Sequence, residues 1–143
     1  MSRIYVASSW RNQEQQSVVT RLREFGHKVY DFKNPPGKSG FAWSQLDPNW
    51  EKWTSLDYVH NLAKPVDSHG FLSDYRAMQW ADTCVLVLPC GRSAHIEAGY
   101  FNGANKRLLI YIPERQEPEL MYLMANQICL TMSELLSALQ EGT

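Results

Sequence analysis

Hydrophobic residues along the chain alternate between two spacings, one typical of β-strands and one typical of amphipathic helices. Residues 3–7 form a short apolar run, and apolar side chains in 12–25 recur at helical spacing until Gly26 ends the helix. Residues 28–32 then alternate between polar and apolar, as a second strand does. Strands that alternate with helices in this way are typical of a parallel sheet with crossover helices.

The second half of the chain continues the pattern, with apolar runs that suit strands buried on both faces of a sheet. The pattern predicts helices over 71–80, 93–103, 118–125 and 132–140, and strands over 83–88, 107–112 and 127–130. Ser93 is the expected N-cap of the helix over 93–103, because its hydroxyl can accept a hydrogen bond from a free backbone N–H group. The sequence therefore predicts an α/β fold, a flavodoxin-like, doubly wound, five-stranded parallel sheet with strand order 2-1-3-4-5.

The segment 34–69 interrupts this regularity with four prolines and three tryptophans, among them Trp43. A connection of this length inside a compact domain is usually functional or carries short helices of its own, here expected at 44–46 and 56–63. Its aromatic side chains could form a lid, with Trp43 as a candidate for stacking on a flat base. They could equally form a satellite hydrophobic cluster that holds down a long loop, which we favour.

Length, composition and charge restrict the classes of function. The 143 residues suit one domain, 1–143, and 44% apolar with 20% charged residues is near the globular average. A net charge of −1 argues against a general binder of nucleic acid polymers or membrane surfaces, because such proteins need a basic excess. No signal peptide precedes the first strand and no apolar run approaches ~18 residues, so we expect a cytoplasmic protein. The cysteines and histidines lack metal-ligand spacing, so no metal site is predicted.

Two loops rich in small and polar residues follow strands of the predicted sheet. In open parallel sheets a ligand binds beyond the carboxyl ends of the strands, where the strand order reverses. Both loops lead into a helix N-terminus, which suits an anion, and each carries an arginine. The candidate anion-binding residues are Ser8, Ser9, Arg11, Gly91, Arg92 and Ser93. For the first loop a capped helix start with an exposed arginine is about equally favoured, and Trp10 is a candidate for stacking on a base.

Two carboxylates are the main candidates for chemistry. Glu97 lies about one turn into the helix over 93–103, beside Ala98 and Gly99. A glutamate that faces a crevice next to small residues is a candidate nucleophile or base, although a glutamate near a helix N-terminus can simply interact with the dipole. Asp74 lies among apolar neighbours on the helix over 71–80, where a carboxylate needs a reason, although stabilisation by the helix dipole is equally favoured. Tyr5, on the first strand, would by default be a core tyrosine.

These residues occur in an order that resembles a known family. A tyrosine-bearing first strand leads into a Ser-x-Arg turn, here from Tyr5 to Arg11. Asp74 stands eight residues before the aspartate of an Ala-Asp pair, which is followed by an apolar strand. A loop of small residues comes next, and Glu97 follows it, directly before Ala98-Gly99. The chain resembles the nucleoside 2-deoxyribosyltransferase family, and within it the branch of 2'-deoxynucleoside 5'-monophosphate N-glycosidases.

The resemblance implies a role for each of these residues. Glu97 would attack the anomeric carbon of the sugar, Asp74 would assist the leaving base, and Tyr5 would position Glu97, as two carboxylates do in glycosidases. The 5'-phosphate would be held by Ser9, Arg11 and Ser93. The chemistry needs no metal and no organic cofactor, the partner is a small nucleotide, and a homo-oligomer is expected because family members commonly form one.

The residues are also compatible with two other functions. The fold is similar to Toll/interleukin-1 receptor domains, several of which cleave NAD with a glutamate at the matching place, and the additional Arg92 would suit a second phosphate. A non-catalytic nucleotide sensor, which binds without turnover, would keep the same phosphate loops. The sequence does not determine which base is released or which sugar is preferred. It also does not determine whether the acceptor is water or a second base.

Overall fold

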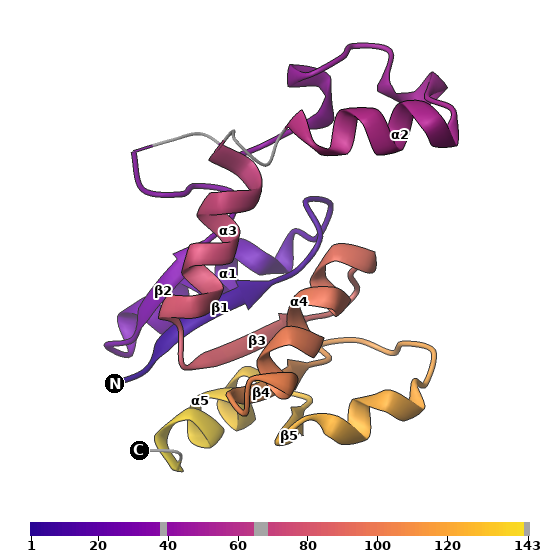
Figure 1. The fold of residues 1–143 in the computed structure, drawn as a ribbon. Coiled ribbons are helices and arrows are strands. Elements are labelled where there is room, and N and C mark those ends of the chain that lie inside the picture. The colour runs from indigo at the N-terminus through magenta and orange to yellow at the C-terminus, as the bar shows by residue number, and fades with distance from the viewer. Residues whose placement is uncertain (38–39, 65–68, 142–143) are drawn as a thin grey trace.

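The sheet of this protein has five parallel strands with helices on both faces, in a computed structural model that describes residues 1–37, 40–64 and 69–141 (Figure 1). The strands are β1 (Arg3–Ala7), β2 (Lys28–Asp31), β3 (Thr83–Val87), β4 (Arg107–Tyr111) and β5 (Gln127–Cys129). Their order is β2-β1-β3-β4-β5, and every neighbouring pair is parallel, so the predicted fold class and strand order are confirmed.

Helices cover the two faces of the sheet in pairs. The helices α1 (Glu14–Glu24) and α5 (Met132–Glu141) lie on one face, and α3 (His69–Trp80) and α4 (Arg92–Gly103) lie on the other (Figure 1). Because side chains alternate along a strand, Ile4 and Val6 of β1 pack toward α1 and α5, whereas Tyr5 and Ala7 pack toward α3 and α4. No helix in the described part of the chain is both long and apolar enough to cross a membrane.

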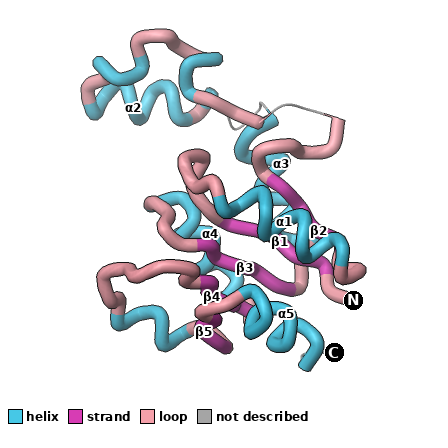
Figure 2. The backbone as a smooth tube through the Cα atoms, turned by 180° about the vertical axis from the view of Figure 1, so that it is seen from behind, coloured by secondary structure: helices cyan, strands magenta, loops and turns pink. Residues whose placement is uncertain are grey.

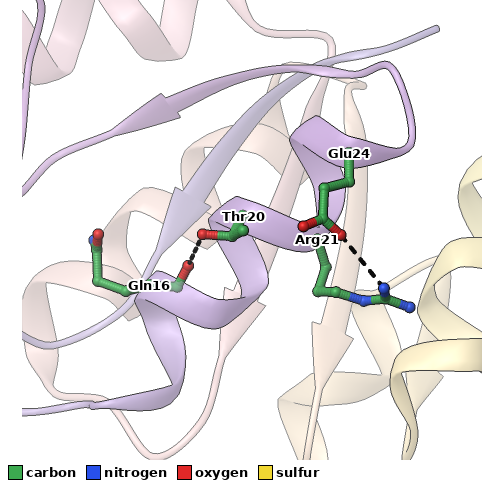
Figure 3. Close-up of polar contacts among 4 residues, drawn as sticks. All are labelled: Gln16, Thr20, Arg21 and Glu24. Carbon is green, nitrogen blue, oxygen red and sulfur yellow. Dashed lines mark hydrogen bonds and ion pairs between the residues drawn. The ribbon is translucent and has the colours of Figure 1, made fainter.

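The outer face of α1 is polar and contributes little to its attachment (Figure 3). The Thr20 hydroxyl donates to the Gln16 carbonyl at 3.0 Å, and Arg21 forms an exposed ion pair with Glu24 at 3.4 Å. Exposed pairs of this kind contribute about 1 kcal/mol at most. The helix is therefore held mainly by its buried apolar face.

The segment 34–69 forms two 3₁₀ helices, η1 (Trp43–Gln45) and η2 (Trp50–Lys52), and the helix α2 (Ser55–Leu62). Positions 38–39 and 65–68 of this predicted segment lie outside the described residues. In both views the part around α2 stands off from the sheet (Figures 1 and 2). A capping box of Thr54 and Asp57 begins α2, and none of its residues is buried. The two short helices predicted for this segment are confirmed within a few residues.

One predicted helix is wrong. The α-helix expected over 118–125 is a short 3₁₀ helix, η4 (Leu120–Met124). The Glu119 carboxylate accepts the backbone N–H of Met121 at its start, and Ala125 is already extended at its end. Asn126 then pairs with β4, since its N–H donates to the Leu108 carbonyl and its side chain accepts the Leu108 N–H. The five residues between these constraints are too few for a regular α-helix.

Candidate active site

A buried tyrosine holds the candidate nucleophile. Tyr5 lies on β1 with no exposed surface, and its hydroxyl donates to Oε2 of Glu97 on α4 at 2.5 Å. Side chains alternate along β1, and Tyr5 is on the side that packs against α4. Glu97 lies in the second turn of that helix. The structure thus brings together two residues that are 92 positions apart in the sequence.

A second tyrosine holds the second carboxylate. Tyr30 on β2 donates its hydroxyl to Oδ1 of Asp74 on α3 at 2.8 Å, and the same hydroxyl is 2.9 Å from Oγ of Ser73. The sequence did not single out Tyr30. The sequence shows only that Tyr30 is an inward-facing residue of the second predicted strand. The parallel register pairs Tyr30 with Tyr5, and this pairing places Tyr30 beside the site.

The two tyrosines form one unit. Their rings stack with centroids 5.4 Å apart and an angle of 14° between the planes. Each hydroxyl occupies one oxygen of a carboxyl group. Among the described residues, Oε1 of Glu97 and Oδ2 of Asp74 have no hydrogen-bond partner, and neither oxygen is buried away from solvent. Each carboxyl therefore has one fixed oxygen and one oxygen that can meet a ligand.

Burial raises the proton affinity of both carboxyls. It raises the pKa of Glu97 from 4.5 to about 7, although the hydrogen bond from Tyr5 lowers that pKa, and the charge of Asp74 raises it further. Burial likewise raises the pKa of Asp74 from 3.8 to about 6 against the hydrogen bond from Tyr30. A carboxyl whose pKa lies near neutral pH can both donate and accept a proton at that pH, as acid–base chemistry requires.

The raised pKa of Glu97 predicts a pH-dependent stability cost. The folded state binds a proton more tightly than the unfolded chain, so ionised Glu97 destabilises the protein increasingly as the pH rises from about 4.5 to about 7. We expect Glu97→Gln, which is neutral at every pH, to be more stable than wild type by up to about 3 kcal/mol above pH 7. The difference should shrink toward pH 4.5. Urea unfolding of both proteins from pH 4.5 to 8 measures it, and a pH-independent difference would contradict the assignment.

The loops after β1 and β3 are joined by hydrogen bonds. The Ser8 hydroxyl is buried and donates to the Val87 carbonyl at 2.8 Å, and Ser9 Oγ accepts the N–H of Gly91 at 2.9 Å. Asn12 donates to the same Val87 carbonyl, and its side-chain oxygen accepts the N–H of Glu14 at the start of α1. Asn12 therefore ties the two loops together and accepts the first N–H of α1, whose N-cap is Gln13.

The N-terminus of α4 is the open end of this loop pair. Gly91, not the predicted Ser93, is the N-cap of α4, because the contact with Ser9 fixes Gly91 in an extended conformation one residue before Arg92. No side chain caps α4, so its first-turn N–H groups are free to bind an anion. Arg92 and Ser93 are the first two residues of α4 and are exposed, and Arg11 is exposed in the loop that Ser9 joins to Gly91.

The two candidate stacking residues lie in different surroundings. Trp10 is 52% exposed in the loop after β1 and packs edge-on against Phe32, with the ring centroids 5.4 Å apart. Trp43 is half-buried between Phe41 and Trp53, with ring centroids 5.0 and 5.7 Å away. Trp43 therefore belongs to a satellite aromatic cluster, whereas Trp10 has an exposed ring beside the loops that carry the candidate site.

Cys90 Sγ lies 3.7 Å from Nδ1 of His95, but the thiol is not activated. Burial and the charge of Glu97 raise the pKa of the Cys90 thiol to about 12, which disfavours the thiolate. His95 contacts the Gly91 carbonyl through Nδ1 at 2.7 Å and the Tyr122 hydroxyl through Nε2 at 2.8 Å. In the described parts of the chain, no three His, Cys, Asp or Glu side chains come together as metal ligands would.

The chain shares its fold with two solved enzymes. A scan against protein-family models and a search of curated proteins found no match. The chain is similar to a 2-deoxyribosyltransferase from the psychrotolerant bacterium Bacillus psychrosaccharolyticus, with 19% identity and a TM-score of 0.61 over 92% of this chain and 88% of that chain. It is also similar to the CMP N-glycosidase BcmB of Clostridium botulinum, with 16% identity and a TM-score of 0.51 over 97% and 99%.

At these identities the likeness establishes a common fold. The structure is thus similar to that of a 2-deoxyribosyltransferase, in line with the resemblance that the sequence motifs predict. The likeness extends over nearly the whole length of all three chains.

Proposed function

We propose that this protein cleaves the N-glycosidic bond of a nucleotide, with a nucleoside 5'-monophosphate as the favoured substrate and Glu97 as the nucleophile. The observation that carries the proposal is the pair of carboxyls, Glu97 and Asp74, each fixed by a tyrosine and each with one oxygen that has no partner among the described residues. The two similar solved structures, a 2-deoxyribosyltransferase and an N-glycosidase, support the same type of reaction.

In the first step Glu97 attacks the sugar. A carboxylate oxygen of Glu97 forms a bond to the anomeric carbon while the bond from that carbon to the base nitrogen breaks. The leaving base takes the electron pair of that bond and accepts a proton from the Asp74 carboxyl. The product of this step is a glycosyl ester of Glu97, with Asp74 ionised.

In the second step Asp74 acts as the base. It accepts a proton from water, or from a second nucleobase, while the oxygen or nitrogen of that acceptor attacks the anomeric carbon and releases Glu97. Tyr5 holds Glu97 Oε2 throughout, and its hydrogen bond stabilises the carboxylate that leaves. Water as the acceptor gives hydrolysis, and a second base gives transfer.

The phosphate of the substrate would lie at the open N-terminus of α4. Arg11→Ala should reduce kcat/KM for a nucleoside 5'-monophosphate by about 10- to 100-fold, because a charge-assisted hydrogen bond to a phosphate contributes about 1.5–3 kcal/mol. The kcat/KM for the unphosphorylated nucleoside should change little. Initial rates on both substrates measure this, with Arg21→Ala on the outer face of α1 as the matched control (Figure 3). An equal loss on both substrates would contradict a phosphate contact.

Chromatography of the free base tests the proposed function against its alternatives. Wild type is incubated with ribo- and deoxynucleoside 5'-monophosphates, the corresponding nucleosides, and NAD. Base release from a monophosphate supports the proposal and identifies the base and the sugar. Nicotinamide release from NAD alone would favour the second candidate, a NAD glycohydrolase, which the exposed Arg92 at the start of α4 would suit. Binding without release from any of them would leave a nucleotide sensor.

The homo-oligomer expected from the resemblance stays a prediction. The surface of η4 carries strongly exposed apolar side chains, since Leu120 and Leu123 are 75% and 81% exposed. A surface of this kind suits self-association. Sedimentation velocity of the purified chain measures the oligomeric state.

A further inference from the structure

The hydroxyl of Tyr30 has a position that packing alone does not explain. Its ring is 8% exposed and stacks on Tyr5, and a phenylalanine would fill the same space. The hydroxyl instead lies between two consecutive side chains of α3, at 2.9 Å from Ser73 and 2.8 Å from Asp74. A buried hydroxyl that donates to a carboxylate fixes both the position and the proton affinity of that carboxylate.

The direction of the hydrogen bonds follows from their chemistry. Tyr30 has one hydroxyl proton, and it is donated to Oδ1 of Asp74, so the Ser73 hydroxyl donates to the tyrosine oxygen. The resulting chain runs from Ser73 through Tyr30 to Asp74. It holds one carboxyl oxygen of Asp74 and leaves the other, Oδ2, without a partner among the described residues.

We propose that Tyr30 is a positioning residue for Asp74, which turns Oδ2 of that carboxyl toward the substrate and sets the pH range in which Asp74 can exchange a proton. This inference rests on the proposed function and adds to it a residue that touches no substrate. The arrangement repeats that of Tyr5 and Glu97: a tyrosine on a strand holds one oxygen of a carboxyl on a helix.

Other titratable groups also act on Asp74 and must be kept constant in a test. In the described residues these are Tyr5 on β1 and Glu97 on α4, both of which interact with its charge, besides Tyr30 itself. Burial raises the pKa of Asp74, and the Tyr30 hydrogen bond is the group that lowers it. Removal of that hydroxyl should therefore raise the proton affinity of Asp74 and leave Tyr5 and Glu97 in place.

The decisive experiment titrates Asp74 directly, without substrate. The ¹³C shift of the Asp74 carboxyl is followed against pH in wild type and Tyr30→Phe, and Asp74→Asn identifies the signal by its loss. We expect the midpoint of Asp74 in Tyr30→Phe to rise by about one pH unit, the size of one hydrogen bond to a charged group. Tyr58→Phe, at a tyrosine 47% exposed on α2, is the matched control and should leave the midpoint unchanged.

Kinetics of the same variant give the second readout. In Tyr30→Phe, kcat should fall about 10-fold with little change in KM, and the alkaline limb of the pH profile should move up by about one unit. A lower rate with an unchanged Asp74 midpoint would overturn the inference, since lost packing alone gives that result.

If wild type releases no base, the proposed function fails and the titration alone decides the inference. If Tyr30→Phe does not fold, Ser73→Ala should move the midpoint in the same direction by less, and an unchanged midpoint would overturn it.

Discussion

Glu97→Gln should reduce base release from the preferred nucleotide by at least ~10³-fold, because the amide cannot form the glycosyl ester of the first step. The amide oxygen can still accept the hydrogen bond from Tyr5, so the fold and the position of the side chain should be kept. Nucleotide binding should therefore survive within a few-fold. Steady-state release measures the rate, and calorimetric titration with the nucleotide measures the binding.

The control for this prediction is Glu24→Gln on the exposed face of α1, which removes the same charge far from the site. It should leave both rate and binding at wild-type level. A folded Glu97→Gln protein that still releases base at more than a tenth of the wild-type rate would show that Glu97 is not the nucleophile.

Asp74→Asn should reduce kcat/KM for a nucleoside monophosphate by about 10²- to 10⁴-fold, because the departing base loses its proton donor. Wild type should show a bell-shaped pH profile with its maximum between about pH 6 and pH 7, where the two carboxyls together hold one proton. Because Glu97 has the higher pKa, the single proton lies mainly on Glu97 in this range, and the reactive form, with Glu97 ionised and Asp74 protonated, is a minority. This form is lost at lower pH, where both carboxyls are protonated, and at higher pH, where Asp74 has no proton to donate. In Asp74→Asn the alkaline limb should therefore disappear. Initial rates from pH 4.5 to 9 measure both effects.

The leaving group provides a control within the same protein. Nicotinamide departs from NAD as a neutral molecule and needs no proton, so any cleavage of NAD should depend far less on Asp74 than cleavage of a monophosphate does. A bell-shaped profile that persists in Asp74→Asn would assign the proton donor to another group.

The main features of the fold could be predicted because they depend on local patterns. Strands with buried runs and helices with one apolar face determine which segments form the sheet, and a helix between consecutive strands makes these strands parallel. The 3₁₀ helix η4 could not be predicted in this way. Its length depends on the pairing of Asn126 with β4, which is a contact between distant segments.

The candidate site could be predicted in part for the same reason. Glu97 is a candidate from its position on a predicted helix beside small residues, whereas the roles of Asp74 and Tyr5 follow from the family resemblance. Tyr30 was missed because its role depends on the register between β1 and β2, which no single segment encodes. Ser8 was predicted to contact the substrate, and its hydroxyl donates to the Val87 carbonyl, a bond that only the folded loops reveal.

The measurement that tests the central claim most directly is chemical rescue of Glu97→Ala. Base release from a deoxynucleoside 5'-monophosphate is followed for wild type and for Glu97→Ala, with and without added formate, a small carboxylate that can occupy the space of the missing side chain. The account predicts release by wild type, none by Glu97→Ala, and recovery that increases with the formate concentration. Release by folded Glu97→Ala at the wild-type rate without formate would contradict it.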